Sequence, residues 1–465
     1  MNSSSISPAV LAELGQQVTG PVLTAQDDGY ERETTAYNLA TAIRPDVVVG
    51  AVDAADVAAA VAWAAVHHVP VGVQATGHGA DRPMRGGLLI NTARLQECTV
   101  DPDTRIARVG AGVRWRTVLE SAVPHGLAGL NGSTTDVGVV GYTLGGGVPV
   151  LGRTYGFAAD RVRSFDVVTP GGAHRRVDAG HEPELFGLLR GGKGNLGIVT
   201  AMEFELVALE GLYGGGIFYP GADAREVLTA WSRWSADLPE TVSTSIALLR
   251  LPEMDIVPEP LRNQFVVHLR YACTADQEDS ARLLSPMRAV SHPVMDTVGP
   301  MSYRDMDGIH MDPPVPLPYL DAGRLLDDMD EATVEGLLAH AGPGTDCPLL
   351  LVEIRLLGGA LDRSPEGPAD LVTGRQGAYL LNMVGLAVPP AAEQVPHAVT
   401  ALLEALDGHV SDRTPVNFQG VLGWEPGSAH AWTEDGHSRL LAAKAHYDPE
   451  NLLRFQHAVQ APAST

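Results

Sequence analysis

The stretch Val69-Pro70-Val71-Gly72-Val73-Gln74-Ala75-Thr76-Gly77-His78-Gly79 decides how this chain is organised. An apolar run rich in β-branched residues predicts a strand that ends directly in a turn of small residues. Glycine on both sides of His78 lets the backbone bend and approach a ligand closely. Successive N–H groups in such a turn can also hold phosphate oxygens. The residue types alone leave two interpretations of His78 open, a solvated turn histidine or part of a site.

The segments around this turn predict strands that alternate with a helix. Residues 46–50 form a short apolar run, and Asp53 then precedes an Ala- and Val-rich segment at 54–67, as a helix N-cap does. After the strand at 70–73, the apolar residues 88–91 predict a further strand. Strand, helix and strand at this spacing indicate a βαβ unit.

Two more glycine-rich stretches follow. Residues 131–147 carry five glycines in their last ten positions, interleaved with apolar residues, which is unlike a flexible linker. This pattern indicates either close backbone packing or a wall for a flat or phosphorylated ligand, and it is neither a Walker A loop nor a clear dinucleotide fingerprint. Residues 190–200 lead into a strand predicted at 199–206. Lys193 in this stretch is either a phosphate contact or a solvated loop lysine.

Composition limits the possible partners. A chain of 465 residues exceeds one ordinary core, so more than one domain is expected. The net charge of −24, from 56 acidic and 32 basic residues, argues against binding to nucleic acid or to anionic membranes. Neither a signal peptide nor a transmembrane run is indicated, so we expect a cytoplasmic protein without a membrane partner. Cys98, Cys273 and Cys347 are too far apart to indicate a disulfide framework or a zinc site, and no metal is expected.

The pattern changes near residue 210. Strands are predicted at 243–251, 264–272, 349–357 and 377–386, and helices at 224–234, 276–287, 330–340 and 396–406. This alternation predicts an α+β domain with helices over one face of a sheet. The proline-rich run 313–319 cannot form a regular element and is expected to be a loop that lines a site. Glu353 and Arg355 share one face of a predicted strand, where they form mutual or solvated ion pairs or act in a site. A last helix is expected from about residue 428 to residue 447.

Taken together, these motifs resemble those of the berberine bridge enzyme-like flavin oxidases, which share the vanillyl-alcohol-oxidase or PCMH-type FAD-binding fold. The resemblance covers about residues 40–206 and the last fifty residues. It rests on the ordered set Ala75–Gly79, Gly138–Gly147, Arg153–Gly156, Arg190–Thr200, Asn417-Phe418 and Tyr447–Asn451. The middle of the chain matches only in general pattern, as expected of a region that holds the substrate.

The resemblance implies an α+β chain in three parts. Residues 1–207 would form an FAD-binding domain of two subdomains, and residues 208–413 a substrate-binding domain with an antiparallel sheet covered by helices. Residues 414–465 would complete the FAD-binding domain. His78 would bond covalently to the 8α-methyl carbon of the flavin. The implied cofactor-binding residues are Ala75, Thr76, Gly77, His78, Gly79, Gly132, Ser133, Thr134, Val137, Gly138, Gly141, Tyr142, Gly194, Gly197, Ile198, Val199, Asn417 and Asn451.

At four positions, the residue type affects which properties of the family can be expected of this chain. Thr134 replaces a cysteine that makes a second link to the flavin in many relatives, so at most one covalent link is expected. Pro149 stands where relatives usually carry glycine. Pro415 stands where a tyrosine often acts as the base, which leaves the base open. Val137 lies where a small β-branched residue leaves room for oxygen, which favours an oxidase.

The resemblance implies an FAD-dependent oxidase of the kind that acts in secondary metabolism. It would remove a hydride from an alcohol, amine or hemiacetal carbon of a small molecule to flavin N5, with O2 as the acceptor. Tyr142, Glu353 and Asn417 are the catalytic candidates, with Asn417 as an orienting group. One alternative is a non-redox cyclase with structural or auxiliary FAD. Another is a binding protein without a cofactor, for which His78 and the glycine-rich stretches would be coincidental. The oligomeric state stays open.

Overall fold

The computed structural model describes residues 6–423, 430–455 and 457–459. Its N-terminal part contains a four-stranded sheet in the order β1-β3-β6-β4 (Val22–Leu23, Val47–Gly50, Leu88–Asn91 and Val71–Gln74). Strands β3 and β4 both run parallel to β6, which lies between them. Helix α3 (Ala54–Val66) connects β3 to β4, and the Asp53 side chain accepts a bond of 2.9 Å from the Asp56 N–H. The predicted βαβ unit and its cap are therefore confirmed.

A second sheet of five antiparallel strands follows, in the order β11-β10-β12-β8-β7 (His174–Asp178, Val162–Val168, Ile198–Glu205, Ile106–Gly110 and Cys98–Asp101). Strands β10 and β11 pair as a hairpin. The short pairs are β2-β5 (Ile43–Arg44, Met84–Arg85) and β9-β13 (Leu127–Ala128, Val207–Ala208). The helices of this part are α1 (Pro8–Gln17), α2 (Tyr30–Thr34), α4 (Trp115–Ala122), α5 (Val139–Leu144), α6 (Gly152–Tyr155) and α7 (Pro183–Leu189).

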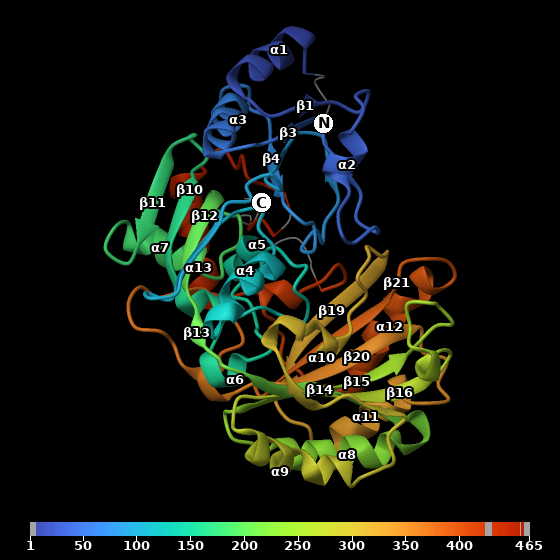
Figure 1. The fold of residues 1–465 in the computed structure, drawn as a ribbon. Helices are drawn as coiled ribbons and strands as arrows, with labels where there is room; N and C mark the ends of the chain where they lie inside the picture. The colour runs from blue at the N-terminus through green and yellow to red at the C-terminus, as the bar shows by residue number, and fades with distance from the viewer. Residues whose placement is uncertain (1–5, 424–429, 456, 460–465) are drawn as a thin grey trace.

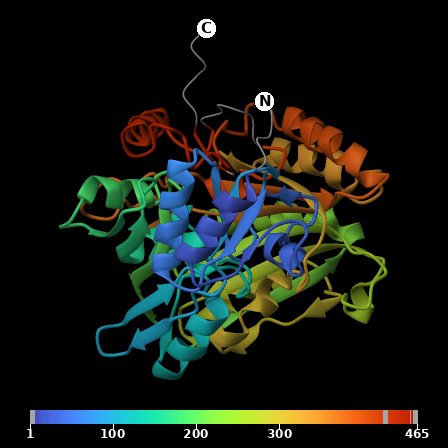
Figure 2. The ribbon, with the colours of Figure 1, turned by 90° about the horizontal axis from the view of Figure 1, so that it is seen from above.

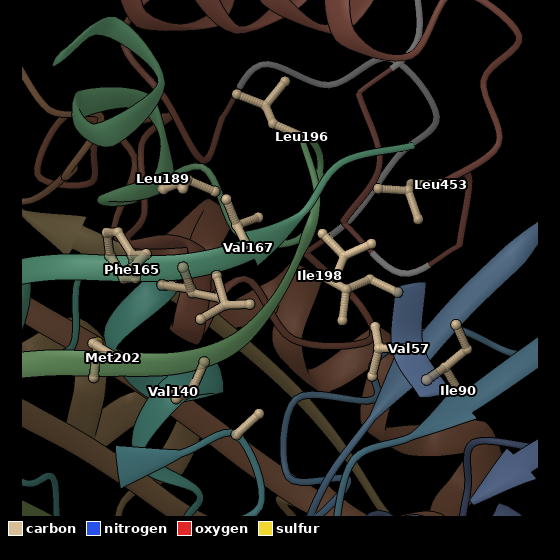
Figure 3. Packing of buried hydrophobic residues seen from close by; sticks show 14 of the residues in the cluster. Val57, Ile90, Val140, Phe165, Val167, Leu189, Leu196, Ile198, Met202 and Leu453 are labelled. Atoms are coloured by element: carbon tan, nitrogen blue, oxygen red, sulfur yellow. The ribbon is translucent and has the colours of Figure 1, made fainter. Parts of the chain in front are cut away.

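One hydrophobic cluster joins the two N-terminal sheets to the C-terminal segment. Figure 3 shows Val57 and Ile90 from the first sheet region and Phe165 and Met202 from the second, with Leu453 nearby. Helix α13 (Glu434–Tyr447) packs its buried residues into the same cluster. Burying apolar side chains together is the main force that holds such elements in place. The end of the chain therefore returns to the N-terminal part of the molecule.

The middle of the chain forms an eight-stranded antiparallel sheet. Its order is β17-β14-β16-β15-β20-β21-β19 (Met295–Asp296, Leu212–Pro220, Phe265–Cys273, Val242–Arg250, Leu349–Leu356, Tyr379–Leu386 and Tyr319–Leu326), and β18 (Gly299–Met301) pairs with β14. Helices α8 (Ala224–Ser235), α9 (Gln277–Arg288), α11 (Glu331–Ala341) and α12 (Ala391–Ala405) pack on one face (Figure 1). The N-terminal elements lie over the sheet from the other side (Figure 2). The predicted α+β class, with helices over an antiparallel sheet, is confirmed.

The prediction missed some strands of the large sheet and misplaced the start of a helix. The four predicted strands of the large sheet are all present, but β14 and β19 were missed. Three consecutive glycines at 214–216 hid β14, and a Cβ on Gly216 would lie only 2.1 Å from Nε2 of His268, so packing explains one of them. Helix α12 begins five residues before the predicted start at residue 396. The last helix begins at Glu434, while the predicted start near residue 428 lies outside the described residues.

The two large hydrophobic clusters occupy different parts of the chain. One is drawn mainly from residues 14–206 and 416–459, and the other from residues 213–406. The predicted domain boundaries, after residues 207 and 413, fall between these ranges. All three cysteines carry unpaired thiols. No helix in the described part of the chain is both long and apolar enough to cross a membrane.

Candidate active site

A cavity of about 1030 Å³ lies between the N-terminal elements and the face of the large sheet opposite helices α8, α9, α11 and α12. Small-molecule and cofactor sites typically have volumes of roughly 300–1,000 Å³, so this cavity has room for a large ligand. It brings together nearly all of the predicted site residues: Ala75, Thr76, Gly77, His78, Gly79, Gly132, Ser133, Thr134, Val137, Gly138, Gly141, Tyr142, Gly194, Gly197, Ile198, Val199, Glu353 and Asn417. Asn451 is not among the lining residues.

His78 lies in the turn that follows β4. Its ring stacks on Tyr37 with centroids 3.9 Å apart, and its Nδ1 lies 2.9 Å from Oγ1 of Thr76. Its Nε2 is buried and has no hydrogen-bond partner. Burial, followed by the charge of Arg114, lowers the His78 pKa to about 4. The ring is therefore neutral at pH 7, with a nitrogen lone pair available for bonding.

Glycine is required at several points, both in this turn and in the glycine-rich stretch 131–147. The φ angle of Gly77 is +76°, and a Cβ there would lie 2.7 Å from Cα of Ala36. A Cβ on Gly145 would lie 2.1 Å from Oδ1 of Asn417, and one on Gly147 would lie 2.5 Å from the Tyr142 ring. The glycine-rich pattern is thus needed for close packing, and part of the same stretch lines the cavity; its contact with a flat or phosphorylated ligand stays a prediction.

Tyr142 and Asn417 form a connected pair on this wall. Nδ2 of Asn417 donates to the Tyr142 carbonyl at 2.9 Å. The Tyr142 hydroxyl is buried without a hydrogen-bond partner, and burial raises its pKa well above the ordinary value. Asn451 lies instead in a left-handed turn after α13, with φ +48°, and Leu453 and Phe455 reach the cavity from this segment.

A group of ionisable side chains lines the cavity, of which the sequence analysis named Lys193 but missed Asp81, Asp321 and His457. Nε2 of His457 lies 2.9 Å from Oδ2 of Asp81. Lys193 donates to the Gly141 carbonyl at 3.2 Å, and burial lowers its pKa to about 8. Asp321 accepts a bond of 3.0 Å from the Val421 N–H, and burial together with Asp81 raises its pKa to about 7. Their positions along the chain gave a signal, because Asp81 lies two residues after Gly79 of the histidine turn and Asp321 lies two residues after the proline-rich run 313–319.

The proline-rich loop reaches the cavity as predicted. Pro313, Pro314, Leu317 and Pro318 all line it, and the Tyr37 hydroxyl donates to the Pro313 carbonyl at 2.6 Å. Tyr37 is the residue whose ring stacks on His78. The loop therefore supports the histidine turn through Tyr37.

The sheet contributes a buried charged cluster to the opposite end of the cavity. Arg270 and Arg355 both contact Glu353, at 2.8 and 3.3 Å, and Nε2 of His310 lies 3.7 Å from it. Burial alone would raise the Glu353 pKa, but the two guanidinium groups outweigh burial and hold it well below the ordinary value. Glu353 and Arg355 do share one face, as predicted, and they form a mutual ion pair that faces the cavity.

Comparison with known protein families indicates that the cofactor is FAD. Residues 45–178 match the family described as FAD binding domain. This chain carries an FAD binding domain. The domain includes β4, the His78 turn and residues 132–148, which contribute lining residues to the cavity.

Relatives with curated names match only in part. An FAD-linked oxidoreductase of Bacillus subtilis, YgaK, is 28% identical over 237 residues, which cover 50% of this chain and 52% of that protein. (R)-6-hydroxynicotine oxidase of Paenarthrobacter nicotinovorans is 26% identical over 234 residues, which cover 50% of this chain and 48% of that protein. The matched region thus spans about half the length of these relatives.

Solved structures match over almost the whole chain. 6-Hydroxy-D-nicotine oxidase from Arthrobacter nicotinovorans superposes with a TM-score of 0.80 at 20% identity, covering 99% of this chain and all of that one. A BBE-like protein of Physcomitrella patens gives a TM-score of 0.82 at 17% identity and covers 98% of this chain and all of that one. The chain therefore has the fold of the BBE-like, PCMH-type FAD oxidases, and the predicted resemblance is confirmed.

The cavity residues fit FAD on three counts. Glycines leave backbone open along the turn and loop of the FAD binding domain, where N–H groups suit pyrophosphate oxygens. The unpartnered Nε2 of His78 lies buried at the cavity wall, available for a bond. The volume also exceeds what a small substrate alone would need.

Proposed function

We propose that this protein is an FAD-dependent oxidase of a small molecule with an alcohol, amine or hemiacetal carbon. The main observation in support is that one cavity is lined both by the FAD binding domain and by ionisable side chains of the large sheet. Bound FAD would supply the two-electron acceptor for a hydride from the substrate, with reoxidation by O2 yielding hydrogen peroxide. The names of the relatives, which include oxidases of a hydroxynicotine and of xylooligosaccharide, support this class of reaction.

His78 is proposed as the covalent attachment point of the flavin. Its ring is neutral at pH 7, its orientation is fixed by Tyr37 and Thr76, and one ring nitrogen lacks a partner. Thr134 also lines the cavity but has no thiol to form a second link. We therefore expect one covalent bond, at His78.

Asp321 is proposed as the general base, in place of the catalytic candidates from the sequence. A base works best when its pKa lies near the operating pH, and the Asp321 pKa is raised to about 7. Glu353 is a weak base because two arginines hold its pKa low, and the Tyr142 hydroxyl stays protonated because burial raises its pKa. Asp321 would take the proton from the substrate O–H or N–H, while Asn417 positions the backbone near Tyr142.

A non-redox cyclase that keeps FAD as a structural group is the second candidate. It is favoured by Pro415, which stands where relatives often have a tyrosine base, and by Pro149 in the glycine-rich segment. The Asp321 carboxyl could serve acid–base chemistry in such a reaction as well. The two candidates differ in whether turnover consumes oxygen.

The test begins with the visible spectrum of the purified protein, followed by a screen of alcohols, amines and sugars. An oxidase should be yellow, lose its flavin colour with substrate under anaerobic conditions, and release one hydrogen peroxide per O2 consumed. Product formed without oxygen uptake or flavin bleaching would instead establish the cyclase. A colourless protein that does not bind added FAD would refute both.

A further inference from the structure

The cavity face of the large sheet carries a compact polar patch made of His268, Arg270, Glu353 and Arg355. In the register of the sheet, Ser245 on the central strand β15 lies between Arg270 on β16 and Arg355 on β20. Ala247 lies in the same way between His268 and Glu353. Neighbouring strands are about 4.8 Å apart, so small residues on the middle strand let long side chains meet above it. The four side chains of the patch therefore meet because small residues occupy the strand between the two strands that carry them.

The patch holds more positive than negative charge. The guanidinium groups of Arg270 and Arg355 share the single carboxylate of Glu353, and the side chains are only 3%, 10% and 3% exposed, respectively. Burial, with Arg270 next to them, lowers the pKa of both His268 and His310, which leaves these rings neutral. Within this group of Arg270, Arg355 and Glu353, the charges sum to +1 in a protein whose net charge is −24, so one positive charge has no counterion inside the group.

The acidic side chain of Asp307, which also lines the cavity, already has other partners. Asp307, on the same short helix α10 (Asp307–His310) as His310, accepts from the backbone N–H and the hydroxyl of Thr135 at 2.7 and 2.6 Å and lies 3.5 Å from Arg116. Nε of Arg355 is buried and has no hydrogen-bond partner among the described residues, although its guanidinium lies 5.5 Å from the Phe418 ring centre. An unpaired buried charge is costly, so the site is complementary to one more anion.

We infer that this patch binds a carboxylate group of the substrate, with Arg355 as the direct contact and Arg270 behind it. The planar guanidinium fork matches a carboxylate in two parallel hydrogen bonds. A single excess charge matches a monoanion better than a phosphate dianion. The inference rests on the proposed function only in taking this end of the cavity as the substrate end. It narrows the substrate to a small acid that carries the oxidisable carbon at a distance from its carboxylate.

Titration calorimetry on the protein as purified tests this without requiring turnover. The probes are benzoate and hexanoate, each compared with its neutral amide, benzamide and hexanamide. We expect at least one acid to bind more tightly than its amide by about tenfold or more, because a charged hydrogen-bonding pair is then completed. Arg355→Gln should remove that preference, and Arg355→Lys should restore part of it. The matched control is Arg375→Gln, a similarly buried arginine (11% exposed) paired with Asp160 and Asp370 away from the patch, which should keep the preference.

The outcomes separate the two proposals. Equal affinity for acid and amide, or binding of neither member of any pair, would overturn the carboxylate site even if the protein is yellow and releases peroxide. A preference for inorganic phosphate over both acids would also overturn it. A colourless protein with a clear preference for acids would refute the flavin oxidase and retain the carboxylate site.

Discussion

Nη1 of Arg270 lies 2.8 Å from Oε1 of Glu353, and both side chains are only 3% exposed. The two residues come from strands that do not pair directly, because β15 lies between them. An ion pair so deeply buried is held by its geometry, since each charge loses its hydration and needs the other. This pair fixes the position of Arg355 as well, because the same carboxylate accepts from both guanidinium groups.

Glu353→Gln is expected to destabilise the protein strongly. The substitution keeps the shape of the side chain but leaves two buried guanidinium groups without a counterion, and breaking a buried pair costs about 3–5 kcal/mol. The loss should be measured as the change in free energy of unfolding in urea, followed by tryptophan fluorescence.

Glu240→Gln serves as the control for this prediction. Glu240 pairs with Arg363 at the surface, where the two side chains are 47% and 63% exposed. Exposed pairs contribute about 0.2–1 kcal/mol, so this variant should unfold almost as the wild type does. Equal losses in both variants would mean that burial of the Arg270–Glu353 pair has no special role.

His78→Ala should abolish covalent retention of the flavin. In the wild type, we expect the yellow colour to stay with the protein after acid precipitation, because the neutral ring offers a nitrogen for a permanent bond. In the variant, the colour should pass into the supernatant, while the protein before precipitation still binds FAD through its turn and loops. Thr134→Ala is the control, and it should keep the colour in the pellet because Thr134 makes no link.

Colour that passes to the supernatant from the wild type would show non-covalent FAD. Retention of colour in the His78→Ala pellet would place the link on another residue. Either result would overturn the role of His78 without changing the fold.

The sequence predicted well what depends on local pattern. The strand predicted at 70–73, the Asp53 cap, and the shared face of Glu353 and Arg355 follow from periodicity and capping chemistry, and all three are present in the structure, with the strand shifted by one residue to Val71–Gln74. The role of His78 in a cavity wall followed from a resemblance, because glycine and histidine types alone fit an ordinary turn. Strand β14 was missed because three glycines obscure its alternation.

The residues of the site that the sequence did not reveal depend on long-range packing. Arg270 and Glu353 are 83 positions apart in the chain, and no local pattern shows that the small Ser245 and Ala247 lie between their strands. Asp321 is similar, since its pKa shift comes from burial and from Asp81 on a distant segment. Such groups acquire their chemistry only when the two parts of the chain meet.

Gly145→Ala should lower both the stability of the protein and its affinity for FAD. The added Cβ would lie 2.1 Å from Oδ1 of Asn417 and 2.7 Å from Cε of Lys193, so both side chains must move. Overpacking of this kind costs about 1–3 kcal/mol. Gly145→Ala and its control, Gly141→Ala, are compared in the His78→Ala background, where no covalent bond to residue 78 can hold the flavin. Thermal unfolding without added FAD measures the stability, and the flavin-to-protein absorbance ratio after dialysis measures retention.

Gly141→Ala, in helix α5, whose C-cap is Gly145, separates the two effects. No atom lies within 4 Å of the added Cβ, and Gly141 lines the cavity. Its unfolding should match that of the wild type or occur slightly later, because alanine favours a helix over glycine by about 0.5–1 kcal/mol. Retention of FAD should fall if the flavin packs on this wall, and unchanged retention would place the flavin elsewhere in the cavity.

Asp321→Asn should reduce the rate of substrate oxidation by about 10²–10⁴-fold, which is the usual contribution of a positioned base. A base acts only when deprotonated, and the Asp321 pKa is raised to about 7. In the wild type, kcat/KM should therefore rise as the pH increases through about 7 and level off above it. In the variant this rise should vanish. Asp328→Asn, just beyond the end of β19 and 52% exposed, should leave the profile intact.

The same carboxyl also predicts how stability depends on pH. Between the unfolded-state value of about 4 and the folded-state value of about 7, the folded protein binds the Asp321 proton and the unfolded chain does not. Its contribution is therefore present below about pH 4 and is lost as the pH rises through about 7. Wild type should lose more stability than Asp321→Asn over this range, measured by thermal unfolding. A variant that keeps both the kinetic rise and the wild-type pH dependence of stability would show that Asp321 is neither the base nor the group that titrates near neutrality.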